Sequence, residues 1–469
     1  MKFHCDTIAA IATAMSDSGI GIIRISGDEA IQIADRIFRS VNPDKKLINV
    51  KSHTVHYGYI YDGDIFLDEV MAVIMKAPKS YTTEDTVEIN CHGGVLMVNR
   101  ILETVLKYGA RLAEPGEFTK RAFLNGRIDL SKAEAVIDII HSKNEFALKA
   151  GTAQLKGNVS EAVGSMREKI LYEIAFIESA LDDPEHISLD GFHDRISLNV
   201  DNLLKNLSKL IDSADNGKML KEGINTVILG KPNAGKSSLM NLLVGEEKAI
   251  VTNIAGTTRD ILEENIKLHG IGFNMIDTAG IRETEDIVEK IGVEKALKCA
   301  ENADLVIYVV DSSVFLDESD FAIMDFMKTK KSIVLLNKTD LETIVTEEIL
   351  KEKLLYYMGE SAKNLPIIKT STKENTGIDV FENQIKEMFF HGELSFNDEV
   401  YITNMRHKEA LMDAFKSLKM VKQSIEDDMP EDFLSIDLMS AYASLGRIIG
   451  EEVGEDLVNE IFSKFCMGK

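Results

Sequence analysis

The pattern of apolar and polar positions changes along the chain, and each kind of pattern predicts a different architecture. In residues 1 to about 125, the apolar run Ile8 to Ala12 is followed by the segment GIGIIRIS and by a long alternating stretch that is interrupted at Asp62-Gly63. Asp-Gly readily takes the positive φ values of a two-residue turn, so this stretch predicts a β-hairpin. We therefore expect an α+β domain at the N-terminus.

A helical period follows, from Ser131 to Asp183 and again from His193 to Leu220. Apolar residues there recur at steps of three and four, as in the stripe Ile196, Val200, Leu203, Leu207 and Leu210. The same period returns near the C-terminus in two stripes, Leu411, Phe415, Leu418, Ile425 and Leu438, Tyr442, Leu445, Ile449. These segments predict a helical bundle made from two separate stretches of chain.

A phosphate-binding pattern lies between the two helical stretches. Gly230-Lys-Pro-Asn-Ala-Gly-Lys-Ser237 fits GxxxxGK[ST] and follows the apolar run Thr226 to Leu229, which predicts a buried strand. The glycines permit a tight turn whose backbone N–H groups face the phosphates, Lys236 reaches the outer phosphates and Ser237 can ligate Mg²⁺. The pattern predicts a nucleoside triphosphate site.

The other parts of a guanine-nucleotide switch follow in chain order. Asp277-Thr-Ala-Gly280 comes after the apolar FNMI, and it is expected to support Mg²⁺ through Asp277 and to contact the γ-phosphate through the Gly280 N–H. In Asn337-Lys-Thr-Asp340, the Asp340 carboxylate can accept two hydrogen bonds from a guanine edge and none of equal quality from adenine. Ser371-Thr372-Lys373 is expected to close over the base, with threonine in place of the usual alanine. GTP is therefore the predicted nucleotide.

A polar loop, Thr252 to Asp260, lies between the first two motifs, and we assign Thr258 to the Mg²⁺ shell beside Ser237. Ile281 stands where many small GTPases keep a water-orienting glutamine, so this chain must activate water differently. The predicted nucleotide contacts are Asn233, Ala234, Gly235, Lys236, Ser237, Ser238, Thr252, Asn253, Ile254, Ala255, Gly256, Thr257, Thr258, Asp277, Thr278, Ala279, Gly280, Asn337, Lys338, Thr339, Asp340, Ser371, Thr372 and Lys373.

Three features together resemble the potassium-activated GTPases: Asn233 in the phosphate loop, the segment Gly256-Thr-Thr-Arg-Asp260 and the aliphatic Ile281. The C-terminal Phe465-Cys-Met-Gly-Lys469 narrows the resemblance to one family, the tRNA-modification GTPases called MnmE or TrmE. The resemblance runs along the whole chain and includes the N-terminal segments DTIAAIAT, GIGIIRISG, EINCHGG and PGEFTKRAFLNGRIDL.

The resemblance implies hydrolysis that depends on K⁺, because a fixed cation that bridges the phosphates can replace an arginine finger. Glu289 is then expected to position the attacking water, although a solvated acidic helix face is the alternative reading of this residue. The expected K⁺ ligands are Asn233, Thr252, Ile254 and Thr257, and the expected catalytic residues are Glu289, Asn233, Thr257 and Thr258.

The resemblance also implies a homodimer whose N-terminal domain binds a folate, 5-formyl- or 5,10-methylene-tetrahydrofolate. A carboxylate can accept hydrogen bonds from the folate ring edge, while cations suit its glutamate tail or polar ring atoms. Arg24 and Glu88 can alternatively form a cross-strand ion pair, Arg127 can cap a loop, and the C-terminal tail can be a frayed helix end. Cys466 is a possible nucleophile, although a tail cysteine is more often a packing residue. The expected folate contacts are Arg24, Glu88, Arg127 and Lys469.

By the same resemblance, the chain joins an FAD-dependent partner, MnmG or GidA, in a cytoplasmic heterotetramer or larger complex. That complex adds a carboxymethylaminomethyl or aminomethyl group to C5 of the wobble uridine of certain tRNAs, with the one-carbon unit taken from tetrahydrofolate. The alternative is a GTP-switched ribosome-assembly or RNA-binding module without modification chemistry. The sequence shows neither a second phosphate loop nor a basic RNA-binding module.

Charge and cysteine usage change this picture in two respects. The net charge is −24, from 53 Lys and Arg against 77 Asp and Glu, which is the wrong sign for holding RNA by general electrostatics, so any tRNA contact must be local or shared with a partner. The four cysteines show no CxxC spacing, and the adjacent Cys91-His92 pair is predicted to lie in an ordinary loop. No apolar run approaches the ~18 residues of a membrane span.

We therefore predict a multidomain α/β protein in which a Ras-like P-loop GTPase domain is inserted into a helical bundle. The expected limits are 1–125 for the N-terminal α+β dimerisation and folate-binding domain, 126–220 for the first helical part, 221–391 for the GTPase domain and 392–469 for the second helical part with the Cys-Met-Gly-Lys tail. Short glycine-containing joints mark the insertion, so its two ends should lie close together.

Overall fold

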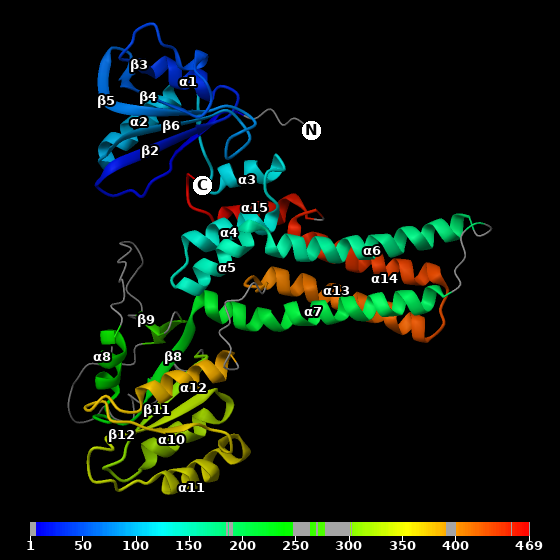
Figure 1. The fold of residues 1–469 in the computed structure, drawn as a ribbon. Helices are drawn as coiled ribbons and strands as arrows, with labels where there is room; N and C mark the ends of the chain where they lie inside the picture. Colours follow the sequence, from blue (N-terminus) through cyan, green and yellow to red (C-terminus); the bar gives the residue numbers. More distant parts are fainter. Residues whose placement is uncertain are drawn as a thin grey trace. The chain divides into compact units, whose positions relative to one another are not determined.

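The computed structural model describes residues 6–183, 186, 191–246, 263–268, 271–276, 301, 303–390, 400–451 and 453–468. The chain divides into two compact units, each built around a β-sheet with helices (Figure 1). The first unit consists of Met1–Ile140, Gln154–Asp201 and Asp413–Lys469, and the second consists of His141–Ala153 and Asn202–Met412.

The sheet of the first unit has seven strands in the order β3-β4-β5-β6-β2-β1-β7. The strands are β1 (Ile8–Ile11), β2 (Ser18–Ser26), β3 (Phe38–Ser40), β4 (Thr54–Asp62), β5 (Ile65–Met75), β6 (Thr86–Gly93) and β7 (Arg111–Leu112). The predicted hairpin is β4–β5, but its turn is one residue later than expected. Because Asp62 pairs with Ile65, the two turn residues are Gly63, with φ of 63°, and Asp64.

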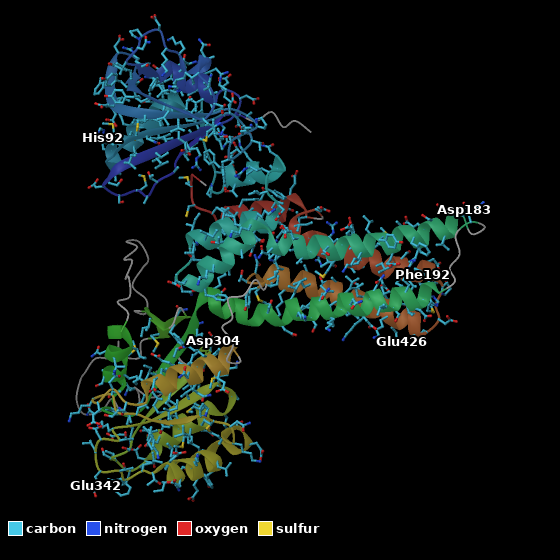
Figure 2. The ribbon with its side chains drawn as sticks, viewed as in Figure 1. His92, Asp183, Phe192, Asp304, Glu342 and Glu426 are labelled. Atoms are coloured by element: carbon cyan, nitrogen blue, oxygen red, sulfur yellow. The ribbon has the colours of Figure 1, made fainter. Side chains whose placement is uncertain are left out.

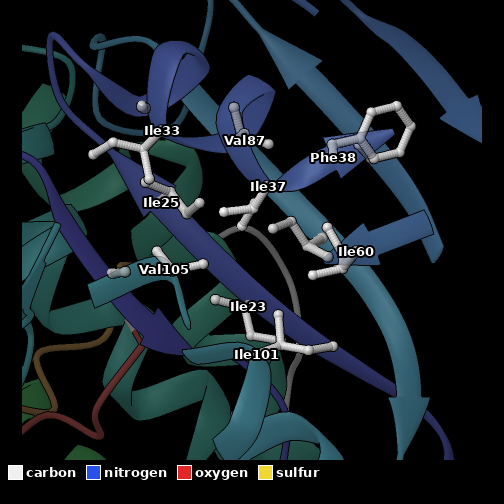
Figure 3. Close-up of a cluster of buried hydrophobic side chains, with 14 of the residues drawn as sticks. Ile23, Ile25, Ile33, Ile37, Phe38, Ile60, Val87, Ile101 and Val105 are labelled. Carbon is white, nitrogen blue, oxygen red and sulfur yellow. The ribbon is translucent and has the colours of Figure 1, made fainter. Parts of the chain in front are cut away.

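Helices α1 (Ala30–Ile37) and α2 (Val95–Lys107) cover one face of this sheet. Alternate strand residues meet the apolar sides of both helices in one continuous core, in which Ile23, Ile60 and Ile101 point toward one another (Figure 3). Each Å² of apolar surface removed from water contributes about 25 cal/mol, so this core is what holds the helices on the sheet.

The opposite face of the sheet is covered at one end only, in the part of the chain that the structure describes. At β1, Ile8 and Ala10 pack with Phe118 of helix α3 (Glu117–Leu124). At the other end, β4 and β5 present Val55, Tyr57 and Met71, which are 59, 50 and 42% exposed. The register of the strands places Ala10, Arg24, Glu88, Val73 and Val55 in one cross-strand row on this face.

A buried ionic network holds α3 beside the covered end. The Arg121 side chain, only 7% exposed, donates hydrogen bonds to Glu84 and Glu117, and Arg111 also pairs with Glu117. Burial opposes the ionisation of Glu117, but the hydrogen bond from Arg111 and its other partners outweigh burial and hold the pKa of Glu117 below its usual value. Removing one partner from such a buried network costs about 3–5 kcal/mol, so the position of α3 is strongly specified.

The predicted helical stretches are present, and the one from Ser131 to Asp183 is divided into three helices. The stripe on α7 is buried at Ile196, Val200, Leu203 and Leu207. Helices α6 and α14 lie side by side, and Asp183, Phe192 and Glu426 mark one end of the long helices (Figures 1 and 2). The helices are α4 (Leu130–Ile140), α5 (Glu145–Lys156), α6 (Asn158–Asp182), α7 (Phe192–Glu222), α13 (Met405–Glu426), α14 (Glu431–Ile449) and α15 (Glu455–Ser463).

The second unit contains a six-stranded sheet in the order β13-β12-β11-β8-β10-β9, parallel except for the β9–β10 pair. Its strands are β8 (Ile224–Leu229), β9 (Glu263–Leu268), β10 (Ile271–Ile276), β11 (Leu305–Asp311), β12 (Ser332–Asn337) and β13 (Ile367–Lys369). The helices described with them are α8 (Lys236–Glu246), α10 (Glu318–Phe326), α11 (Glu347–Met358) and α12 (Ile378–Phe390). Every residue of β11 and β12 is buried, as expected for parallel strands that are packed on both faces.

The chain enters and leaves this second sheet at neighbouring points. The Ile402 N–H donates to Ser213 Oγ on α7 over 3.3 Å, and a Cβ at Gly217 would lie 2.2 Å from the Ile402 carbonyl oxygen. Phe146 of α5 joins the core of the same unit, with its ring 5.4 Å from that of Tyr401. The predicted fold class is confirmed: an α+β N-terminal part, a set of long helices, and a phosphate-loop α/β unit inserted between α7 and α13.

One local expectation is wrong. Cys91 and His92 lie in strand β6 rather than in a loop, and His92 is found at the sheet in Figure 2. His92 Nδ1 lies 2.7 Å from Asp68 Oδ1, and this hydrogen bond raises the pKa of His92. None of the helices in the described ranges is long and apolar enough to cross a membrane.

Candidate functional site

The phosphate loop joins β8 to α8 and requires an unusual backbone at three positions. Gly230, Asn233 and Gly235 have φ of 149°, 62° and 106°. Asparagine tolerates the left-handed region better than most residues. Glycine is essential at 235, because a Cβ there would lie 2.1 Å from the Asn337 Nδ2 atom. Such a turn before a helix N-terminus directs backbone N–H groups toward an anion.

The Lys236 side chain is held inside this loop. Its Nζ atom donates to the carbonyl oxygens of Gly230 and Lys231, each over 2.7 Å. Burial lowers the pKa of Lys236, because it disfavours the charged ammonium. A phosphate bound at the loop would stabilise that charge. Ser237 and Ser238 follow in the exposed first turn of α8, where a hydroxyl can reach a metal ion on the phosphates.

Lys231, which the sequence reasoning did not single out, ties the loop to the start of α10. Its Nζ lies 2.8 Å from Asp320 Oδ2 and 3.1 Å from Asp317 Oδ2. Asp320 is 1% exposed and also accepts a hydrogen bond from the Tyr308 hydroxyl. Burial opposes the charge on Lys231, but the hydrogen bonds to Asp320 and Asp317 outweigh it and raise the pKa of Lys231. The capping pattern of Asp317 and Asp320 was a signal available in the sequence.

Asn337 connects the phosphate loop with the two loops of the base site. Its side chain is fully buried, and Nδ2 donates to the Ala234 carbonyl over 2.9 Å. Oδ1 accepts from the Thr372 N–H over 3.2 Å. One amide therefore fixes the spacing between the part of the site that meets phosphates and the part that meets a base.

The residues predicted to read guanine are gathered where β12 and β13 end side by side. Asp340 Oδ1 accepts from Ser371 Oγ over 2.8 Å, which orients the carboxylate. The Lys338 ammonium lies 2.6 Å from Asp311 Oδ2. Burial opposes the ionisation of Asp311, but the hydrogen bond from Lys338 outweighs it and holds the pKa of Asp311 below its usual value. Thr339 Oγ1 bonds the Thr370 carbonyl, so the two loops are joined directly.

Some predicted residues lie outside the described residues: Thr252, Asn253, Ile254, Ala255, Gly256, Thr257, Thr258, Asp277, Thr278, Ala279, Gly280 and Glu289. The strand that leads to Asp277 is described. β10 is parallel to β8, and Ile276 pairs with Val227, so β10 ends on the same side of the sheet as the phosphate loop. Ligands of open α/β sheets bind at this carboxyl edge of the strands.

A second group of predicted residues meets on the N-terminal sheet. Arg24 Nε lies 2.8 Å from Glu88 Oε1, so the cross-strand ion pair that the sequence allowed does form. The Arg24 guanidinium lies 5.8 Å from the ring centre of Tyr81, and that of Arg127 lies 4.8 Å from it. Arg127 Nη1 also donates to the Tyr81 carbonyl over 3.2 Å. Tyr81, which the sequence gave no reason to select, is the residue around which the set is arranged.

The C-terminal tail is packed into the same place and is not a frayed helix end. Arg24 Nη1 donates to the Gly468 carbonyl over 3.2 Å, and the Gly116 N–H donates to the Cys466 carbonyl over 3.4 Å. Gly468 is buried with φ of 86°, and a Cβ there would lie 2.2 Å from the Ile11 carbonyl oxygen. The Cys466 side chain is exposed beside this group. Lys469, the fourth predicted folate contact, lies outside the described residues.

Comparison with known proteins matches both the N-terminal part of the chain and the remainder to one family. Residues 7–127 match the family model described as the GTP-binding protein TrmE N-terminus, and residues 130–466 match the MnmE helical domain. A tRNA modification GTPase MnmE of Lachnoclostridium phytofermentans is 60% identical over 464 residues, which cover 99% of each chain. This chain belongs to the MnmE family of tRNA modification GTPases.

A second MnmE, from Clostridioides difficile, is 47% identical and covers 100% of both chains. Among solved structures, the G domain of the T. maritima FeoB iron transporter is 28% identical and covers 36% of this chain and 98% of its own, with a TM-score of 0.24 that is too low to support a conclusion. Membership of the MnmE family implies GTP and Mg²⁺ as ligands. The described residues fit them, with backbone N–H groups and Lys236 for phosphates and Ser237 for the metal ion.

Replacing Asp340 with Asn should reverse the choice of base. The carboxylate would be lost as an acceptor, and the new amide donor matches the exocyclic oxygen of xanthine. We expect GTP affinity to fall about tenfold to a hundredfold, the equivalent of one charge-assisted contact of roughly 1.5–3 kcal/mol, and xanthosine triphosphate to become the preferred ligand. Competition titration checks this, with Asp379→Asn, an acidic residue of the exposed start of α12, as the control. A variant that still prefers GTP as strongly as the parent would reject the role of Asp340.

Proposed function

We propose that this MnmE-family protein is a K⁺-activated GTP hydrolase that modifies the wobble uridine of certain tRNAs. It acts with an FAD-dependent partner of the MnmG or GidA type, in the cytoplasm, and adds a carboxymethylaminomethyl or aminomethyl group to C5. One observation supports the proposal above all others. The chain combines a phosphate loop joined to the predicted base loops with a second group, Arg24, Glu88 and Arg127, against which the C-terminal tail packs. Relatives that match the whole chain are named tRNA modification GTPases.

We propose that the predicted domains, 1–125, 126–220, 221–391 and 392–469, have separate roles. The first segment dimerises and binds folate, the third hydrolyses GTP, and the other two form the helical part that carries the tail. Because a net charge of −24 disfavours holding tRNA by general electrostatics, we propose that the partner protein supplies part of the RNA contact.

Asn233 is suited to hold K⁺ at the phosphate loop. Its backbone has φ of 62°, and its side chain is exposed and makes no hydrogen bond within the described residues. We propose that its amide oxygen binds K⁺ together with oxygens of Thr252, Ile254 and Thr257, while Ser237 and Thr258 hold Mg²⁺. Glu289 then positions the water, because Ile281 cannot.

The group around Tyr81 fits a tetrahydrofolate, which supplies a one-carbon unit when it is bound. Glu88 can accept hydrogen bonds from the donor edge of the folate ring while Arg24 keeps the carboxylate oriented over 2.8 Å. Arg24 also holds the Gly468 carbonyl, which brings the end of the chain to the site. Lys469 is proposed to complete the folate contacts and Cys466 to take part in the modification.

The uncovered end of the N-terminal sheet face supports a homodimer. Tyr57, Tyr59, Tyr61 and Phe66 form a chain of aromatic contacts with ring centres 5.8–6.0 Å apart. Exposed aromatic and apolar side chains in a continuous patch are typical of protein interfaces. Val55, two residues before Tyr57 on β4, lies in the cross-strand row of Glu88 and Arg24, so a second copy docked on this patch would lie near the proposed folate site.

Potassium dependence should disappear when Asn233 is replaced. Asn233→Ala and Asn233→Gly both remove the amide, and the glycine variant does so without adding strain at a positive φ. We expect GTP turnover in K⁺ to fall by about 10²-fold or more toward the rate in Na⁺, with GTP affinity nearly unchanged. Turnover measured in the two salts tests this. An Asn233→Gly variant that keeps the full K⁺ response, or a parent with equal rates in both salts, contradicts the mechanism.

A charge placed within the aromatic patch of β4 and β5 should prevent the proposed dimer from forming. Tyr57→Lys can still pair with Glu69, which accepts the Tyr57 hydroxyl in the parent, so the monomer should stay folded. We expect sedimentation velocity at micromolar concentration to show a monomer in place of a dimer. The control is Leu96→Lys on α2, where an 83% exposed side chain lies away from this face. Dissociation by the control, or a dimer that survives Tyr57→Lys, would place the interface elsewhere.

The overall function is tested by separating GTP hydrolysis from modification. Gly468→Ala should expel the tail, because the added Cβ would lie 2.2 Å from the Ile11 carbonyl oxygen and the backbone φ is positive. Deletion of residues 466–469 should act in the same way. We expect both variants to retain K⁺-stimulated GTP turnover and to lose folate binding and wobble-uridine modification, as read by mass spectrometry of tRNA nucleosides from cells that depend on the variant.

Gly454→Ala is the matched control for this experiment, since a Cβ at Gly454 meets nothing within 4 Å. It should leave turnover, folate binding and modification unchanged. Unaltered wobble uridines in cells that lack the protein would overturn the function itself. Normal modification by the tail variants would overturn only the role of the tail.

A further inference from the structure

A shallow, widely open cavity of about 570 Å³ lies on the first unit next to the proposed folate residues. Three parts of the chain line it: His53 before β4, the stretch that runs from Met75 at the end of β5 to Thr83, and Asn125 to Arg127 after α3. The volume lies within the range of roughly 300–1,000 Å³ that is common for small-molecule sites. Only Arg127 among its lining residues belongs to the folate set, so most of the cavity has no role in the function proposed above.

The charges that line this cavity lack counter-charges. Of the arginines from residue 6 to 127, all except Arg127 form an ion pair with a carboxylate, namely Arg24, Arg36, Arg39, Arg100, Arg111 and Arg121. Arg127 bonds only the Tyr81 carbonyl within the described chain, and the Lys79 ammonium makes no hydrogen bond or ion pair there. In a chain with 77 acidic residues, two cations left without a carboxylate at one cavity point to an external anion.

The walls of the cavity are fixed by contacts between its segments. Asn125 Nδ2 donates to the Thr82 carbonyl over 2.7 Å, and the Arg127 guanidinium lies 4.8 Å from the ring centre of Tyr81. Thr83 has φ of 64°, a conformation that is costly for a β-branched residue and persists only where the surroundings impose it. The cavity is therefore a formed feature of the fold, held between the β5–β6 loop and the end of α3.

We propose that this cavity binds the γ-linked glutamyl chain of a polyglutamylated folate, whose ring end lies at Arg24 and Glu88. This inference rests on the folate site proposed above. Tyr81 forms the shared wall, since its ring contacts both Arg24 and Arg127 and its side chain also lines the cavity. Successive carboxylates of the chain then pair with Arg127 and Lys79, two cations that the rest of the protein leaves unneutralised. Phosphates of RNA are disfavoured, because two cations on a chain of net charge −24 are few for a polyanion.

The test compares 5-formyl-tetrahydrofolate with one and with three glutamates, titrated calorimetrically into the full-length protein. We expect the triglutamate to bind about tenfold tighter, as one additional charge-assisted contact implies. Lys79→Gln should reduce the triglutamate to the affinity of the monoglutamate. Lys46→Gln changes an exposed lysine of the same domain outside the cavity lining, and it should keep the tenfold difference. Unchanged affinity for the monoglutamate shows that the N-terminal domain of each variant is folded.

The outcomes separate this inference from the folate site itself. Equal affinities of the two folates for the parent, or a tenfold difference that survives Lys79→Gln, overturns the role of the cavity and leaves the folate site standing. Failure of both folates to bind overturns the folate site and the cavity together. Weaker tRNA binding by Lys79→Gln with an intact triglutamate preference would assign the cavity to RNA phosphates and overturn the inference.

Discussion

The close approach of Gly217 on α7 to the Ile402 carbonyl is the contact that makes the insertion possible. Any side chain at 217 would collide there, since a Cβ would lie 2.2 Å from that oxygen. The contact brings together the chain that enters the second sheet and the chain that leaves it. As a result, α7 and α13 can continue on either side as parts of one set of helices, although about 180 residues separate their facing ends. The inserted nucleotide sheet is therefore joined to two helices at once.

Within the inserted unit, buried polar side chains fix the geometry of the nucleotide site. Asn337 sets the distance between phosphate loop and base loops, and Lys231 holds the loop to the start of α10. Both interactions matter strongly for stability. A buried amide or carboxylate that loses its partner lowers the free energy of unfolding by more than the intact pair raises it. These contacts fix the spacing of the described parts of the nucleotide site.

One face of the N-terminal sheet carries three different surfaces from one edge to the other. Its β1 end is closed by α3 and the tail, its middle carries the Arg24–Glu88 ion pair, and its β4–β5 end is exposed and aromatic. Antiparallel sheets can leave one face open to other partners, which is what makes such an arrangement possible. The proposed folate site, the dimer surface and the chain terminus lie close together for this reason, and the cationic cavity adjoins them through Tyr81.

The sequence alone determined the features that depend on local spacing. Helical periods, the phosphate-loop glycines and the strand before each motif are all set by residues within a few positions of one another, and so they could be predicted. Contacts between distant segments could not. The sequence left open whether Arg24 pairs with Glu88, 64 residues away, and whether the C-terminal tail is packed or frayed. Only the tertiary structure shows that pair and the contact of Arg24 with Gly468, 444 residues away. The contacts of Tyr81 and Lys231 became visible in the same way. Cys91 and His92 were assigned to a loop because a strand buried on one face is specified by its neighbours across the sheet, which no local pattern records.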